Sequence, residues 1–292
     1  MTNESPPLHH RLLADLSLLV ITAIWGSTFI MVDKAIETIN VLVFLFYRFT
    51  IAFIVLLIIF GYRLLKIRIH WRDIWPGIVI GVFLFAGYSF QTFGLDLGTD
   101  PGKTAFITGL YVVLVPLFAS FILRKKPHYL SWIGIIVAVV GLGLLSIESF
   151  SSFQFSDIFS DLLVLIGAVA FAFHIISIDK FVGRIDYSIL TIVQIGTTAI
   201  LAGTTALIMG FVPSILKVPV LPIIFNNQVI FAIIFTGIIA TALILAMQTF
   251  AQKKTSPTHV ALIFAMEPVF GHYLQFYSQV KFYSHVNGLV VH

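Results

Sequence analysis

The sequence of 292 residues contains no cysteine, which excludes disulfide bonds, thiolate metal sites and cysteine nucleophiles. Charge is also scarce: Asp, Glu, Lys and Arg make up 10% of the chain, against about 25% in soluble domains. A chain this poor in charge cannot cover its surface with polar groups, and its mean hydropathy is +1.04. The net charge of +4, without a basic stripe, gives no sign of nucleic-acid binding. The composition therefore predicts a protein whose surface faces lipid.

Enzyme motifs are lacking as well. The chain has no H-E-x-x-H pair, no G-x-S-x-G turn and no G-x-x-x-x-G-K-[ST] phosphate loop. Glu267 is the single acid deep inside an apolar run, so the paired carboxylates of an aspartyl protease are not expected, and we expect no cofactor and no metal. A lipid-modifying membrane enzyme stays open, because Asp15, Asp161 and Asp179 lie at the ends of apolar runs. A channel or structural role is a third alternative.

Apolar runs of about 20 residues, the length that crosses a bilayer as a helix, recur along the whole chain. We read the first as an uncleaved helix, because it is too long for a signal peptide and no small-residue cleavage site follows it. The connections leave no room for a soluble domain. The sequence predicts an all-α integral membrane protein with about nine spans, at residues 16–32, 41–62, 74–95, 104–123, 130–147, 162–178, 189–212, 229–250 and 259–276.

The distribution of basic residues predicts the orientation. Most of the 17 lysines and arginines fall at Arg11 and in the segments 63–72, 124–126, 180–184 and 253–254, all on one side of the predicted bundle. Basic residues accumulate in cytoplasmic loops. We therefore expect a multi-pass protein of the cell membrane (the inner membrane of a cell with two) with a cytoplasmic N-terminus.

Two parts of the chain resemble each other. Asp15 is followed by Asp33-Lys34, and Asp161 is followed at the same spacing by Asp179-Lys180. The stretches Val115-Pro116-Leu117 and Glu267-Pro268-Val269 also correspond. Two halves of five helices, 12–147 and 161–292, would then have opposite orientations, as in secondary transporters with a midplane site. The alternative is that the matched residues are only flanking charges.

Four motifs resemble EamA-type members of the drug/metabolite transporter superfamily. They are Trp25-Gly26-Ser27-Thr28-Phe29, Arg48-Phe49, the stretch 105–117 (AFITGLYVVLVPL) and Glu267-Pro268-Val269, and the resemblance runs from Leu12 to Gly271. It implies two inverted five-helix repeats and the movement of small metabolites such as amino acids, amines or drugs. Because no ATP-binding motif is present, we predict a secondary transporter, acting as an exporter by alternating access. Its partners would be a small-molecule substrate and the lipid bilayer.

The chain departs from this family after Gly271. Residues 272–292 contain no apolar run long enough to cross a membrane, although a tenth helix should follow. Back-translated and read one base earlier, the segment can encode a family-like end of the ninth span and the start of a tenth. We therefore hypothesise a shifted reading frame, which leaves the second repeat without its last helix. The alternative consequence is a truncated transporter without function.

Glu267 is the first candidate site residue. A carboxylate about ten residues into a span is costly unless it is protonated or paired. It could carry a coupling proton or bind a cationic substrate, or it could join two helices through a neutral hydrogen bond. Pro268 lacks a backbone N–H and frees a carbonyl one turn earlier. Arg48 could attract a substrate carboxylate, or its long side chain could extend outward to Asp33 or Glu37.

Uncharged polar and aromatic residues complete the candidate set. Polar groups within spans should face the bundle interior, where some line a cavity and others only bridge helices. His174 could in addition relay protons near neutral pH. Gly77 and Gly81 are read as a helix-packing pair. The further candidates for the cavity are Trp25, Ser27, Tyr88, Gln91, His174, Gln194 and Gln248.

Overall fold

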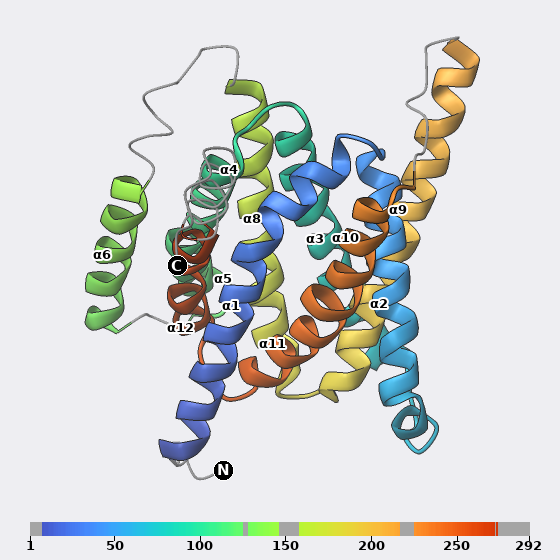
Figure 1. Cartoon of the computed structure of the whole chain (residues 1–292). Coiled ribbons are helices and arrows are strands. Elements are labelled where there is room, and N and C mark those ends of the chain that lie inside the picture. Colours follow the sequence, from blue (N-terminus) through green and yellow to red (C-terminus); the bar gives the residue numbers. More distant parts are fainter. Residues whose placement is uncertain (1–7, 125–127, 146–157, 217–224, 272, 274–292) are drawn as a thin grey trace, which may run out of the picture.

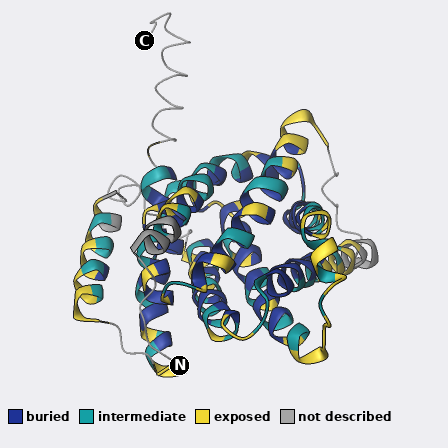
Figure 2. Ribbon diagram, turned by 90° about the horizontal axis from the view of Figure 1, so that it is seen from below, coloured by how far each residue is buried: buried dark blue, intermediate teal, exposed yellow. Residues whose placement is uncertain are grey.

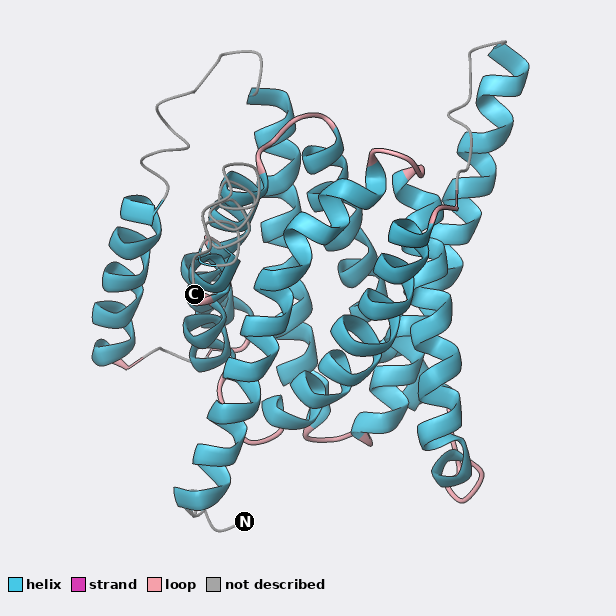
Figure 3. Cartoon of the chain, viewed as in Figure 1, coloured by secondary structure: helices cyan, strands magenta, loops and turns pink. Residues whose placement is uncertain are grey.

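The computed structural model describes residues 8–124, 128–145, 158–216, 225–271 and 273. Within these ranges every regular element is helical, and Figure 3 shows helices joined by short loops. Most helices run roughly side by side, and the first begins at the lower end of the bundle in Figure 1.

The first five predicted spans correspond to six helices. They are α1 (Leu8–Ile36), α2 (Val41–Leu64), α3 (Trp71–Asp96), α4 (Pro101–Gly109), α5 (Tyr111–Ile122) and α6 (Tyr129–Leu145). Helices α4 and α5 form one span interrupted at Leu110, which caps both of them.

The later spans contain two further interruptions. The helices are α8 (Ile158–Val182), α9 (Tyr187–Leu216), α10 (Asn227–Gly237), the π-helix η2 (Ile238–Leu243), α11 (Ile244–Gln252) and α12 (Pro257–Phe264). Elements α10, η2 and α11 together make one span. After α12 the chain turns at Ala265 and Met266, and it is helical again from Glu267 to Gly271.

The prediction of an all-α membrane protein is confirmed. Seven of the expected spans form helices that are long and apolar enough to cross a membrane, and α6 adds a shorter apolar helix over Tyr129–Gly141. The ninth expected span is described only as far as Gly271 and Tyr273. Large apolar side chains such as Ile58 and Phe121 are exposed on the outside, while buried residues face the inside of the bundle (Figure 2). The hypothesis of a shifted reading frame concerns residues 272–292, which apart from Tyr273 lie outside the described ranges.

Local sequence signals fix several helix starts. The Asp100 side chain accepts hydrogen bonds from two backbone N–H groups of the first turn of α4, and Pro101 occupies the first position of that helix. The Ser256 side chain accepts one such hydrogen bond, from the His259 N–H, and Pro257 is the first residue of α12. Such caps satisfy N–H groups that have no partner inside the helix.

Helix α3 lies at the centre and packs against both α8 and α9. Gly77 and Gly81 permit the approach of α9: a Cβ atom on Gly77 would lie 2.6 Å from the Val193 side chain, and one on Gly81 would lie 2.6 Å from the Gln194 carbonyl oxygen. The glycine pair therefore serves packing within one chain. By contrast, α6 stands at the edge of the bundle (Figure 1). The division into two inverted repeats stays a prediction.

Candidate substrate cavity

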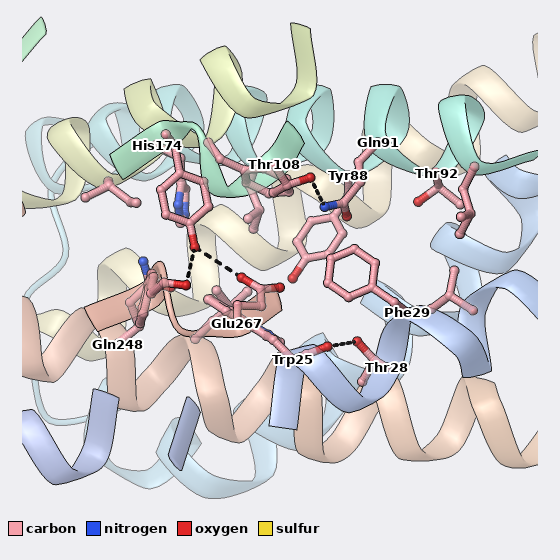
Figure 4. A pocket seen from close by; sticks show the side chains of 18 of the residues that line it. Trp25, Thr28, Phe29, Tyr88, Gln91, Thr92, Thr108, His174, Gln248 and Glu267 are labelled. Carbon is pink, nitrogen blue, oxygen red and sulfur yellow. Dashed lines mark hydrogen bonds between the residues drawn. The ribbon is translucent and has the colours of Figure 1, made fainter. Parts of the chain in front are cut away.

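A cavity lined by side chains from several helices lies in the bundle interior. Seven of the ten residues singled out as cavity or coupling candidates line it, and they come from six different helical segments. These are Trp25, Arg48, Tyr88, Gln91, His174, Gln248 and Glu267. Figure 4 shows how six of them surround the space, with Arg48 not labelled.

The cavity extends from the middle of the bundle toward the end opposite the start of α1. Trp25 lies near the middle of α1, and the lining continues one and two turns further to Phe29 and Val32. On α3 the lining likewise continues from Tyr88 to Leu95, close to the end of that helix. The site is therefore not central but displaced toward one side.

Glu267 is 7% exposed and lies on the cavity wall. The Tyr111 hydroxyl oxygen is 3.1 Å from its carboxylate and 3.1 Å from the backbone carbonyl of Phe264. That carbonyl is four residues before Pro268, which has no N–H to offer it. Helix α1 comes close because Gly26 has no side chain: a Cβ there would lie 2.6 Å from the Glu267 carbonyl oxygen. The glycine of the Trp25-Gly26 motif thus helps to place the acid.

Arg48 turns into the bundle and is 2% exposed. Its Nε donates a hydrogen bond to the Thr241 hydroxyl at 2.8 Å, and its guanidinium carbon lies 4.5 Å from the centre of the Tyr88 ring. None of the ion pairs in the described part of the chain joins Arg48 to an acid, including Asp33 and Glu37. The outward orientation that the sequence left open is therefore not the one the structure adopts.

The π-helix η2 supplies polar contacts to this region. The Trp25 indole N–H donates to the carbonyl oxygen of Ala240 at 2.8 Å, and Thr241, the partner of Arg48, is the next residue. A π-segment widens the helix and changes its regular hydrogen bonding, and such segments are frequent at functional sites. The Trp25 ring also meets Phe264 edge-on at 5.1 Å between centres. Trp25 therefore links α1 to η2 and to the end of α12.

A second group of polar side chains lies on the side of the cavity where α1 begins. His174 of α8 shares a hydrogen bond of 2.9 Å with Gln194 of α9, and Gln194 donates to Thr249 of α11 at 3.1 Å. Gln252, the last residue of α11, donates to the Ile175 carbonyl oxygen at 3.0 Å. We call these five residues the α8–α9–α11 network. It joins three helices at the end of the cavity nearer the start of α1, where His174 and Ile175 are also part of the lining.

The remaining polar candidates differ in their surroundings. Gln91 donates to the Thr108 hydroxyl at 2.9 Å on the cavity wall. Gln248 donates to Gln252 at 3.2 Å, but its side-chain oxygen has no partner among the described residues. Ser27 does not line the cavity, and its hydroxyl donates to the Ile24 carbonyl oxygen of its own helix at 2.6 Å.

The structure adds lining residues that the sequence did not single out. Pro268 is buried but is not part of the lining. Instead, Tyr111 lies at the start of α5 and reaches Glu267, and Phe171 of α8 forms part of the wall. Tyr111 belongs to the stretch 105–117, but an aromatic residue in a span is more often a packing residue, so its type gave no separate signal. Within the described ranges, no three His, Asp or Glu side chains gather as a metal site requires.

Comparison with known proteins supports the resemblance. The sequence model of the EamA-like transporter family matches residues 12–147. A protein of Archaeoglobus fulgidus named "Uncharacterized transporter" is 31% identical over 262 residues, which cover 90% of this chain and 77% of its own. The "Uncharacterized transporter YoaV" of Bacillus subtilis is 21% identical and is matched over 94% of this chain and 93% of its own.

A crystal structure of another protein has the same fold. It aligns with a TM-score of 0.70 at 16% identity, over 97% of this chain and 91% of the other. At this identity the likeness concerns the fold alone. The archaeal relative is 31% identical and is matched over most of both chains, which is sufficient to assign this chain to the same family. The chain is a multi-pass membrane protein and belongs to the EamA-like transporter family.

Proposed function

We propose that this chain is a secondary transporter that exports small metabolites, such as amino acids, amines or drugs, by alternating access. One observation supports this most strongly. A single cavity holds both a buried arginine, Arg48, which has no acidic partner among the described residues, and a buried glutamate, Glu267. Both charges are costly to keep inside a membrane, which favours a role in binding or ion coupling. The arginine suits an anionic group of a solute, and the glutamate suits a cationic group or a proton.

The aromatic side chains favour a solute with an apolar part. Trp25, Phe29, Tyr88 and Phe171 all line the same space. Aromatic faces bury apolar surface and also attract cations. A metabolite of modest size with charged groups and an apolar body fits these walls better than an inorganic ion.

The alternative of a lipid-modifying enzyme receives less support. Asp15 pairs with His259 at 2.9 Å, and Asp161 pairs with Lys103 at 2.5 Å, with Lys103 and Asp161 both largely buried. Neither acid lines the cavity. These carboxylates therefore join helices near the ends of the bundle, and the geometry favours transport over catalysis at the interface.

The test begins with metabolite profiling of cells with and without the gene, followed by uptake of the accumulated compounds into vesicles that contain the purified chain. We expect flux that saturates with concentration and depends on an ion gradient or on exchange. Ser27→Ala, which lies off the cavity, is the matched control for substitutions within it. Flux that rises linearly without saturation would indicate a channel, product formation would indicate an enzyme, and no flux of any compound would support the truncated, inactive alternative.

A further inference from the structure

The Tyr111 hydroxyl stands between two oxygen atoms but carries only one proton. It is 3.1 Å from the Glu267 carboxylate and 3.1 Å from the Phe264 carbonyl oxygen, and all three groups are buried. A phenol can donate one hydrogen bond and accept others. It can therefore donate to only one of these two oxygens at a time.

The protonation state of Glu267 decides which oxygen receives the proton. When Glu267 is protonated, its O–H can donate to the Tyr111 oxygen, and Tyr111 remains free to donate to the Phe264 carbonyl. When Glu267 is ionised, it only accepts, so the Tyr111 O–H turns to the carboxylate, where the charge makes the hydrogen bond stronger. The Phe264 carbonyl then loses the donor that Tyr111 gave it.

This loss falls at an interrupted helix. Phe264 is the last residue of α12, the chain turns at Ala265 and Met266, and Pro268 cannot supply the missing N–H. A buried carbonyl without a donor is unfavourable in an apolar bundle, which favours another arrangement of the turn. The segment after the turn also lies against α1, since the backbone carbonyl of Glu267 is close to Gly26.

We infer that Tyr111 is a positioning residue that transmits the protonation of Glu267 to the turn between α12 and the helix that follows it. This inference deepens the proposed function, since it gives the transporter a proton-driven hinge at its cavity. No proton is lost or gained overall in one cycle. The proton leaves Glu267 to the cavity, and the Tyr111 O–H rotates from the Phe264 carbonyl to the Glu267 carboxylate. Both steps reverse when Glu267 is protonated again.

Within the part of the chain that the structure describes, few other titratable groups lie near Glu267. Across the cavity lie Tyr88 of α3, Arg48 of α2 and His174 of α8, and Figure 4 shows the Tyr88 side chain directed toward Glu267. Helix α11 contributes the neutral Gln248 to the same wall. Helix α1 contributes no ionisable group near Glu267, but its Asp15 pairs with His259 in the first turn of α12. Helix α6 carries no acidic or basic side chain.

The movement of the hinge can be measured as a distance between two labels, which needs no substrate. The chain contains no cysteine, so no native cysteine has to be replaced before labelling. Spin labels are placed on cysteines at Phe159 of α8 and at Tyr273 beyond the turn, both exposed. Their separation is measured in lipid vesicles over a pH series. A control pair at Phe159 and Trp71, on the packed helices α8 and α3, has no part of the turn between its members.

We expect the distance of the first pair to shift between two values with the pH dependence of a single proton, while the control pair stays constant. Glu267→Gln, whose amide N–H can still donate to Tyr111, should hold the low-pH distance at every pH. Tyr111→Phe should remove the pH dependence without returning to the low-pH distance, because Phe264 has then lost the Tyr111 hydroxyl at every pH. If Glu267 and Tyr111 only stabilised the fold, neither substitution would change the pH dependence of the distance.

Two outcomes overturn the inference: a wild-type distance that does not depend on pH, and a Tyr111→Phe distance that follows pH as the wild type does. Unfolding of Tyr111→Phe leaves the decision to Glu267→Gln, where retained pH dependence overturns the inference and a fixed low-pH distance supports it. Failure of the hinge is distinguishable from failure of transport, because vesicle uptake is scored separately. Saturable uptake with a pH-independent turn would retain the transporter and reject the switch.

Discussion

The cavity and the α8–α9–α11 network both place polar side chains inside an apolar bundle, but their partners differ. In the network, His174, Gln194 and Thr249 satisfy one another across three helices. In the cavity, Arg48 has no acidic partner within the described part of the chain, and the Gln248 oxygen has none of any kind there. Groups that satisfy one another hold helices together, whereas a charge without an opposite charge and an oxygen without a donor, both on the cavity wall, are available to a ligand. The contrast separates a closed side of the bundle from a binding side.

The contrast has a thermodynamic consequence. A buried charge usually lowers stability relative to an apolar side chain of similar size, and a hydrogen-bonded buried amide does not. Substitutions in the two regions should therefore have opposite effects: loss of function without loss of stability in the cavity, and loss of stability in the network.

The first prediction assigns the two regions to sides of the membrane. Leu65 follows α2 at the network end, Leu97 follows α3 at the cavity end, and both are exposed. Given a cytoplasmic N-terminus, a cysteine at Leu97 should react with a membrane-impermeant maleimide in intact cells, and one at Leu65 should react only after permeabilisation. The effect is all or none. The reversed pattern would place the cavity end inside and overturn the orientation.

The second prediction concerns the cavity. Arg48→Met removes the charge at nearly constant volume, so the affinity for a transported anion or zwitterion should fall about 10- to 100-fold, as expected for the loss of one charged hydrogen bond. The thermal unfolding temperature should not fall. Uptake assays and thermal unfolding are measured on the same preparation. Unchanged affinity, with Ser27→Ala as the unaltered reference, would mean that Arg48 does not contact the solute.

The third prediction concerns the network. Gln194→Leu removes the partner of both His174 and Thr249, so the chain should lose about 1 kcal/mol of stability, a typical value for interhelical hydrogen bonds in membranes. The matched control is Thr204→Val on the same helix, because the Thr204 hydroxyl is exposed and bonds only to its own helix. Equal unfolding temperatures for the two variants would contradict a structural role for the network.

The smallest effect is expected outside the spans, at Asp186. Burial raises the pKa of this carboxyl, but hydrogen bonds from Ser188 and Arg63 outweigh it and hold the pKa below its usual value. The stabilisation is therefore present above the ordinary Asp pKa of about 4 and is lost as pH falls through the lower folded value. Because Arg63 is half exposed, solvent screens the pair, and its contribution to stability should be small.

Asp186→Asn checks this by acid titration of the unfolding temperature. The variant should lose the small pH-dependent component below about pH 4. The part of this component that comes from Arg63 should shrink at higher ionic strength, where exposed charges are screened. Identical acid profiles for variant and wild type would show that the pair is neutral for stability.

Much of the fold could be predicted from the sequence, because apolar length and capping are local properties. The starts of α4 and α12 follow from Asp100-Pro101 and Ser256-Pro257, which satisfy free N–H groups within one turn. The interruption at Leu110 and the π-segment η2 were not predicted. The π-segment makes a contact far along the chain, since the Trp25 indole N–H donates to the Ala240 carbonyl oxygen.

The sequence by itself determined that the chain crosses a membrane, where its spans lie, and that Glu267 and Arg48 are costly in those spans. Only the tertiary structure decided that both charges share one cavity, that His174 bonds to Gln194, and that Tyr111 reaches Glu267. The physical reason is that hydropathy measures the cost of placing a residue in lipid, which is a property of one position. Whether a polar group meets a partner or an empty space depends on helices far apart in the sequence, and packing alone brings them together.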